Sequence, residues 1–189
     1  MAIIVADVAG HGLPAALLMS NLQARVGMVF DGPENLAGAV ARLNQMICRN
    51  CPVNRFISFF VAVVCPQRGD IRYCNAGHNP PLLLRADGAL QRLETGGGLL
   101  GIDPEGAYAH ADLNMSSGDV LVLFSDGVTE AWRPDGTDDF GEHRVAVIAA
   151  DMRHAPAITI LNAIGDQLMA WIGKADPADD ITLVVAKKT

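Results

Sequence analysis

Four aspartates in this chain stand next to apolar runs that have the character of buried strands. Asp7 directly follows one run, Asp126 comes two residues after a second, and the pair Asp179–Asp180 immediately precedes a third. The runs are residues 3–6, 120–124 and 181–186. Carboxylates at strand ends beside glycine-rich turns can converge at one edge of a sheet, where they supply the oxygen ligands that hard divalent cations need. The alternative is that each is a solvated turn residue, because aspartate favours turns, and the pattern alone does not decide.

Two histidines and one serine suggest a different chemistry. His11 lies between two glycines, Ser125 directly precedes Asp126, and the second histidine is His78. A Ser–His–Asp hydrolase would use these residue types, but Ser125 lacks the Gly-x-Ser-x-Gly turn that would expose a nucleophile. The glycines around His11 also lack the lysine and the spacing of a phosphate-binding P-loop. A serine hydrolase is therefore kept as an alternative to the metal site.

Hydrophobic periodicity predicts the elements that position these residues. Continuous or alternating apolar runs bounded by turn residues indicate strands, and apolar residues that recur every three or four positions indicate helices. We expect strands over residues 2–6, 57–64, 71–75, 82–85, 90–93, 120–124 and 181–186. We expect helices over residues 14–29, 36–47, 142–151 and 158–172, a break at Gly32-Pro33, and loops at residues 96–98 and 133–139. Strands grouped between two helix pairs favour an α+β layered fold over βαβ repeats.

The composition excludes several classes of protein. The chain has 189 residues, of which 50% are hydrophobic and 19% charged, so it can bury a full core. Its 14 Lys and Arg against 21 Asp and Glu give a formal net charge of −7. This balance makes nucleic-acid or anionic-membrane binding a poor expectation. No apolar run is long enough to span a bilayer, and the first residues show no signal peptide. We expect one domain over residues 1–189, located in the cytoplasm.

The spacing and positions of the four cysteines indicate ordinary reduced thiols. Cys48 and Cys51 form a CxxC pair, but no second such pair or histidine pair follows at the spacing of a zinc site. Cys65 and Cys74 lie at or near the ends of apolar runs, where cysteine behaves as a small hydrophobic residue. Reduced thiols fit a cytosolic protein better than a zinc or redox site does.

Four ordered segments resemble one protein family. Residues 7–16 read Asp-Val-Ala-Gly-His-Gly-Leu-Pro-Ala-Ala. They resemble the Asp-x-x-Gly-His-Gly-x-x-Ala-Ala motif of SpoIIE/RsbU-type bacterial serine phosphatases, which belong to the metal-dependent protein phosphatase (PPM) superfamily. Residues 73–81, 123–130 and 179–185 match further family segments in the same order, and residues 99–102 and 140–141 also look like family positions. The resemblance covers essentially the whole chain.

The resemblance implies both a fold and a metal centre. The fold would be a four-layer α-β-β-α sandwich, lacking its first strand. Two ions, Mn²⁺ or Mg²⁺, would lie at one edge of the sheets, where they would polarise a phosphoryl group and activate a water for in-line attack. The family's catalytic metal ligands carry over to Asp7, the Val8 carbonyl, Asp126 and Asp179. Asp180 holds a place that another polar residue often fills, and we count it as a secondary candidate.

Two departures from the family pattern leave alternatives open. The family begins with an earlier strand that carries another metal-binding aspartate, and this chain starts after it. We expect either an N-terminally incomplete sequence or a protein that lacks one ligand. His11 stands four residues from Asp7, whereas the eukaryotic branch has its histidine two residues from the aspartate. His11 is therefore a secondary candidate that serves equally well to fix a tight turn, and His78 is the other secondary candidate.

The function implied by the resemblance is that of a metal-dependent protein serine/threonine phosphatase. By analogy with the family, its substrate would be a phosphorylated regulatory protein, such as an anti-sigma-factor antagonist of the STAS type. An upstream sensor or response-regulator domain and a homodimer are further expected partners. The alternative is a non-catalytic binding or scaffold module that kept the fold and lost a metal ligand.

Overall fold

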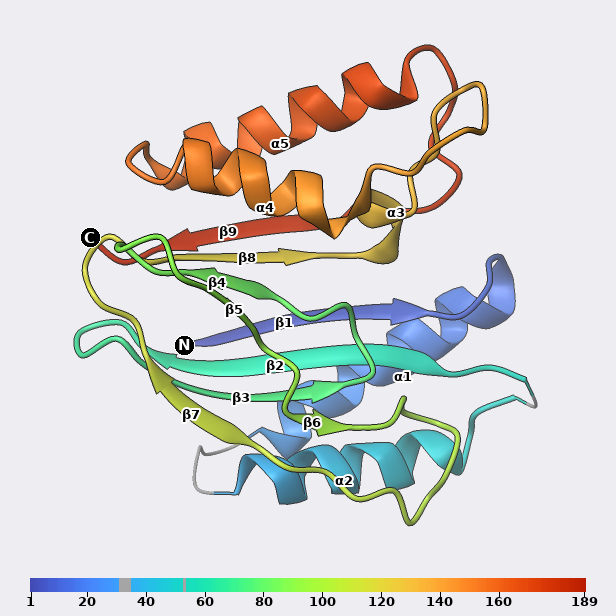
Figure 1. Cartoon of the computed structure of the whole chain (residues 1–189). Helices are drawn as coiled ribbons and strands as arrows, with labels where there is room; N and C mark the ends of the chain where they lie inside the picture. Colours follow the sequence, from blue (N-terminus) through green and yellow to red (C-terminus); the bar gives the residue numbers. More distant parts are fainter. Residues whose placement is uncertain (31–34, 53) are drawn as a thin grey trace. The chain divides into compact units, whose positions relative to one another are not determined.

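The computed structural model describes residues 1–30, 35–52 and 54–189, and these form two compact units. Unit 1 comprises Met1–His78 and Glu94–Asn114, and unit 2 comprises Asn79–Leu93 and Met115–Thr189. Each unit combines one β-sheet with a pair of long helices that covers one face of that sheet (Figure 1). The expected break at Gly32-Pro33 lies outside the described residues.

Unit 1 is built on a five-stranded sheet. Its strands are β1 (Ala2–Val8), β2 (Ile57–Cys65), β3 (Asp70–Ala76), β6 (Gly96–Gly97) and β7 (Ala111–Asn114). The order is β1-β2-β3-β6, and β7 also pairs with β3. Helices α1 (Leu13–Val29) and α2 (Leu36–Cys48) pack their apolar residues onto β1, β2 and β3. The sheet therefore carries Asp7 near the end of its first strand.

The sequence explains where the helices of unit 1 begin and which face they bury. Pro14 stands in the first turn of α1, where its missing N–H costs no hydrogen bond. Asn35 caps α2, because its side chain accepts a hydrogen bond of 2.9 Å from the Gly38 amide. The apolar stripe of α2, at helical spacing, is fully buried. Its members are Leu36, Val40, Leu43 and Ile47.

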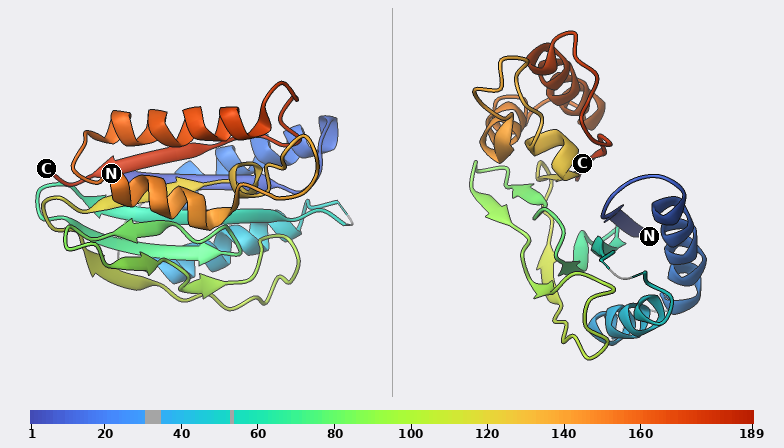
Figure 2. Two further views of the ribbon diagram at one scale, coloured as in Figure 1. Left: turned by 45° about the horizontal axis from the view of Figure 1, so that its top comes forward. Right: turned by 90° about the vertical axis from the view of Figure 1, so that its right-hand side faces the viewer.

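Unit 2 is built on a four-stranded antiparallel sheet in the order β5-β4-β8-β9. The strands are β4 (Leu82–Leu84), β5 (Leu90–Arg92), β8 (Val120–Phe124) and β9 (Leu183–Lys187). Helices α4 (Gly141–Asp151) and α5 (Ala157–Ile172) pack on this sheet, and a four-residue helix, α3 (Asp126–Thr129), follows β8 (Figure 2). All five residues of β8 are buried, so this strand is the centre of the unit's core.

Asp119 anchors the start of β8. Its side chain is 3% exposed, and it accepts hydrogen bonds from the backbone amides of Ser116 and Ala86 at 3.0 and 2.8 Å. Arg85 donates a further bond of 2.9 Å to the same carboxylate. Burial alone would raise the pKa of Asp119, but these donors outweigh it and lower the pKa below the usual carboxyl value. The carboxylate therefore joins the β4–β5 hairpin to the turn that leads into β8.

The structure confirms the α+β class and both helix pairs, and the strands expected at 57–64 and 71–75 and at 82–85 and 90–93 form two antiparallel hairpins. The loop expected at residues 96–98 is wrong in part, since Gly96 and Gly97 pair in parallel with the end of β3. A Cβ on Gly96 would lie 2.6 Å from the backbone nitrogen of Asn75, so only glycine permits this pairing. Asp126 lies two residues beyond the end of β8, as expected, and it opens α3. None of the described helices combines the length and the apolar character that a membrane span requires.

Candidate active site

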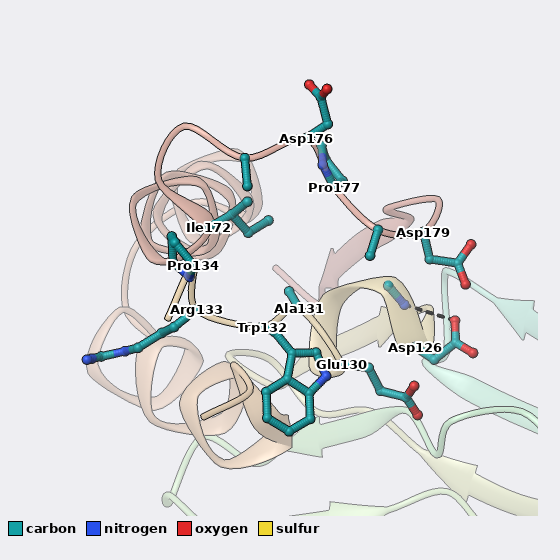
Figure 3. A pocket seen from close by; sticks show the side chains of 13 residues that line it. Asp126, Glu130, Ala131, Trp132, Arg133, Pro134, Ile172, Asp176, Pro177 and Asp179 are labelled. Carbon is teal, nitrogen blue, oxygen red and sulfur yellow. Dashed lines mark hydrogen bonds between the residues drawn. The ribbon is translucent and has the colours of Figure 1, made fainter. Parts of the chain in front are cut away.

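Unit 2 brings two of the predicted metal ligands to one pocket. Asp126 and Asp179 both line a pocket of about 460 Å³, and Figure 3 shows their carboxylates as neighbours directed to the same side. The pocket also contains acidic, aromatic and proline side chains. They include Glu130, Trp132, Pro134, Asp176 and Pro177, and the basic residue Arg133 also lines the pocket. The two aspartates lie 53 positions apart in the sequence, so the adjacent ends of β8 and β9 must bring them together.

The turn after β8 sets the position of Asp126. Ser125 has extended backbone, with φ −79° and ψ 166°, and Asp126 is the first residue of α3. The Gly127 amide donates a hydrogen bond of 2.9 Å to the Asp126 carboxylate, while the Glu130 amide donates to the Asp126 carbonyl at 2.7 Å. A carboxylate in the first turn suits a helix start, where backbone N–H groups point outward. Asp126 is half-buried, so it combines a defined position with access from solvent.

Ser125 lies in the interior and links this turn to the segment that carries Asp179. Ser125 is 4% exposed. Its hydroxyl donates to the Asp180 carbonyl at 2.9 Å and accepts from the Thr182 amide at 2.9 Å. Because the hydroxyl proton is used on a carbonyl rather than a base, the structure contradicts the alternative in which Ser125 is a nucleophile.

Gly127 allows the two segments to approach closely. A Cβ at this position would lie 2.9 Å from the carbonyl carbon of Asp180 and closer still to its oxygen. It would also stand 3.4 Å from the carbonyl carbon of Asp179. Asp180 thus contributes to the candidate site through its backbone. Its carbonyl approaches Gly127, and its amide donates a hydrogen bond to the Asp179 carboxylate at 2.8 Å. The secondary role expected for the Asp180 side chain stays a prediction.

Unit 1 holds the other predicted ligands, Asp7 and Val8. Asp7 is half-buried on β1 and lies directly opposite Ser58 of β2 in the antiparallel register, so the two side chains share one face of the sheet. The Ser58 hydroxyl is 2.8 Å from Nδ1 of His78, which is 4% exposed. Asn75 fixes His78 further by accepting from its amide at 2.8 Å. Sequence reasoning missed Ser58, although it is a polar residue in an otherwise apolar strand.

The loop after Asp7 places His11 at the surface. His11 is exposed between Gly10 and Gly12, which have φ values of 83° and 80°. This left-handed backbone favours glycine. The Arg55 guanidinium donates a hydrogen bond to the Ala9 carbonyl, and a Cβ on Gly10 would lie 2.7 Å from Cζ of Arg55. Arg55 therefore holds the glycine turn, and a chemical role for His11 stays a prediction.

The donor set of unit 2 fits a hard divalent cation. Carboxylate and carbonyl oxygens are the ligands that Mn²⁺ and Mg²⁺ prefer, and Asp126 and Asp179 offer two carboxylates from a closely joined pair of turns. Among residues 1–30, 35–52 and 54–189, no three His, Cys, Asp or Glu side chains form a group that could hold a metal ion. Unit 2 alone thus contributes part of the expected ligand set. Asp7 and the Val8 carbonyl belong to unit 1 and stay predicted ligands.

Three of the four cysteines lie where burial disfavours the reactive thiolate form. All four are free. Burial raises the pKa of the Cys48 and Cys51 thiols, and it raises that of Cys74 to about 12. Reactive cysteines have a lowered pKa instead, so the structure agrees with the expectation of ordinary reduced thiols.

Comparison with solved structures defines the class of fold. The RsbU and RsbW domains of Rv1364c from Mycobacterium tuberculosis superpose with a TM-score of 0.80 at 26% identity, covering 99% of this chain and 51% of that one. The SiaA-PP2C domain of Pseudomonas aeruginosa gives a TM-score of 0.83 at 20% identity, covering 98% and 75%. The catalytic domain of the phosphatase PstP, solved with two manganese ions, gives 0.69 at 15% identity, covering 98% and 86%. The fold is that of the PP2C/PPM phosphatase domains.

Sequence comparison identifies the family within that class. The family profile described as Stage II sporulation protein E (SpoIIE) matches residues 1–189, and the chain belongs to this family. Phosphoserine phosphatase RsbU of Bacillus subtilis (strain 168) is 33% identical over 135 residues. That match covers 71% of this chain and 40% of RsbU, so the chain corresponds to less than half of this relative.

Proposed function

We propose that this chain is the catalytic domain of a metal-dependent protein phosphatase that removes phosphate from serine or threonine. The observation that carries the proposal is that Asp126 and Asp179 line the same pocket, where Gly127 lets the two backbone segments that carry them approach closely. Membership of the SpoIIE family and the PPM fold support it, because relatives in both comparisons are serine or serine/threonine phosphatases.

Asp126 and Asp179 would hold Mn²⁺ or Mg²⁺, together with Asp7 and the Val8 carbonyl, and the relative PstP contains two manganese ions. When bound, such ions polarise the phosphoryl group and lower the pKa of a water for in-line attack. The protein's own part is to hold the carboxylates in place. The hydrogen bond from Gly127 orients Asp126, and that from Asp180 orients Asp179. A water nucleophile needs no covalent phosphoenzyme, which agrees with the buried and doubly bonded hydroxyl of Ser125.

The proposed substrate is a phosphorylated regulatory protein of a partner-switching system, such as a STAS-type antagonist of an anti-sigma factor. Two comparisons support this choice: the curated relative RsbU is a phosphoserine phosphatase, and the solved Rv1364c structure contains both an RsbU and an RsbW domain. We place the activity in the cytoplasm, which four free thiols support. An attached sensor or response-regulator domain and a homodimer belong to the same proposal.

The test is metal-dependent hydrolysis of p-nitrophenyl phosphate and of a phosphoserine protein. Activity should require Mn²⁺ or Mg²⁺ and stop after exhaustive chelation. Asp126→Asn keeps the side-chain size but removes the charge that holds a cation, so it should abolish nearly all turnover. Asp166→Asn is the matched control, because Asp166 is an exposed aspartate of α5 in the same unit. Turnover that survives chelation, or an active Asp126→Asn variant, would refute the mechanism.

The same assay separates the enzyme from a non-catalytic module. A binding module would retain a phosphoprotein without releasing phosphate, whatever metal is added. Because the resemblance implies a further aspartate upstream of Asp7, the assay should compare the 189-residue chain with a longer chain that includes the preceding residues. Phosphate release by the longer chain supports the enzyme, and stable binding without release by both chains supports the module.

A further inference from the structure

Asp179 lies in a segment that has little regular structure of its own. The residues between the end of α5 at Ile172 and the start of β9 at Leu183 are mostly exposed, and they include Pro177. The Asp179 side chain is exposed and accepts a hydrogen bond from the adjacent amide of Asp180. This bond turns with the local backbone, so it cannot fix where the carboxylate lies relative to Asp126. A contact from outside the segment must do so.

Ser125 makes that contact on both sides of residue 181. Its hydroxyl donates to the Asp180 carbonyl and accepts from the Thr182 amide, both at 2.9 Å, and its own amide donates to the Thr182 carbonyl at 3.0 Å. Because Ser125 is 4% exposed, water competes poorly for these groups. Ser125 is also the residue immediately before Asp126. One side chain thus connects the backbone positions next to both carboxylates.

The packing around Ser125 restricts where the two linked segments can lie. Gly127 leaves room for the Asp180 carbonyl, which approaches too closely for any side chain at that position. The ordinary β8–β9 ladder joins Phe124 to Leu183, and it includes no bond to Asp179 or Asp180. The Ser125 hydroxyl extends the connection beyond the end of that ladder. Without it, the Asp180 carbonyl would lose the hydrogen bond from Ser125, and the segment could move away from α3.

We infer that Ser125 is a positioning residue, whose hydroxyl holds the segment carrying Asp179 against the turn carrying Asp126 and so sets the geometry of the two carboxylates. The inference rests on the proposed function for its metal, whereas the contact itself can be tested in metal-free protein. Ser125 would act through the backbone of Asp180 and Thr182, to which its hydroxyl is bonded.

The first test examines the metal-free protein by hydrogen exchange. Ser125→Ala should increase exchange of the Thr182 amide and of the segment over residues 177–182. Ser117→Ala is the matched control, because Ser117 is exposed in the same unit, and it should leave this segment unchanged. Ser125→Thr keeps the hydroxyl, and the extended backbone at this position suits a β-branched residue, so it should restore much of the protection. Unchanged exchange in Ser125→Ala overturns the inference, whatever the metal result.

The second test measures Mn²⁺ binding by calorimetry and the Mn²⁺ dependence of p-nitrophenyl phosphate hydrolysis. Loss of two buried hydrogen bonds next to the ligands should weaken Mn²⁺ binding about tenfold in Ser125→Ala. The Mn²⁺ concentration for half-maximal activity should rise by the same factor, while kcat at saturating Mn²⁺ changes little. Wild-type affinity in a folded Ser125→Ala protein refutes the positioning role. A wild-type chain that binds no Mn²⁺ refutes the proposed function instead, and the exchange measurement then decides on the contact by itself.

Discussion

Gly127→Ala tests whether the close approach of two backbone segments determines the metal site. The added Cβ would stand 2.9 Å from the Asp180 carbonyl carbon, whereas ordinary contact begins at 3.4 Å. The neighbours are backbone atoms, so they cannot rotate away as a side chain would. The segment would have to retreat by roughly 0.5 to 1 Å. Gly127 does not have a left-handed φ, so the variant introduces no backbone strain that would confuse the result.

The expected magnitudes follow from this displacement. Metal–ligand distances are held within about 0.2 Å, so a shift of Asp179 by several tenths of an ångström should weaken Mn²⁺ binding at least about tenfold. Overpacking should lower the free energy of unfolding by about 1–3 kcal/mol. Calorimetric Mn²⁺ titration and urea unfolding measure the two effects. Gly165→Ala is the control, since a Cβ there meets nothing within 4 Å. A folded Gly127→Ala protein with wild-type Mn²⁺ affinity would show that the approach does not set the site.

Two further predictions concern parts of the molecule away from the predicted metal ligands. Asp119→Asn should lower the free energy of unfolding by about 2 kcal/mol at pH 7, because the side chain loses its charge-assisted bond from Arg85 and can no longer accept from two amides. Since the native pKa of Asp119 is lowered, the wild type should keep its higher free energy of unfolding above the usual carboxyl pKa of about 4. It should lose this difference from the variant as the pH falls through the native pKa. Urea unfolding at several pH values checks this, and a difference that grows in acid contradicts it. Burial raises the pKa of the Cys74 thiol to about 12, so Cys74 should react with iodoacetamide at pH 8 more slowly than the half-buried Cys65. Peptide mass spectrometry measures both rates, and equal rates would argue against the buried position of Cys74.

Local patterns in the sequence were sufficient for most of the secondary structure. The α2 stripe from Leu36 to Ile47 has the spacing of one helix face, and the structure buries that face completely. The β2–β3 hairpin follows from two apolar runs separated by Arg68-Gly69-Asp70. Such features depend on residues close together in the chain, so the sequence contains the signal. The fold class followed from the order of the expected helices and strands along the chain.

The chemistry of the candidate site could be predicted in type but not in arrangement. Asp126 and Asp179 were identified from their places beside apolar runs and from the family resemblance, and the structure brings them to one pocket. Their joint placement depends on the pairing of β8 with β9, which lie more than fifty residues apart. No local rule predicts which strands pair over such a distance. The expectation for Asp7 and Val8 as ligands stays a prediction.

The contacts that hold the site in place were decided by the tertiary structure alone. The sequence presents Ser125 as a residue beside an aspartate, with a nucleophile as one alternative. The fold instead buries its hydroxyl between Asp180 and Thr182, 55 and 57 positions away. Likewise, Ser58 meets His78 only because β2 and the end of β3 fold back on each other, and Gly96 pairs with Asn75 only because glycine lacks a Cβ. Residue types determine which hydrogen bonds and close contacts are available to the chain, whereas three-dimensional packing determines which partners come within reach.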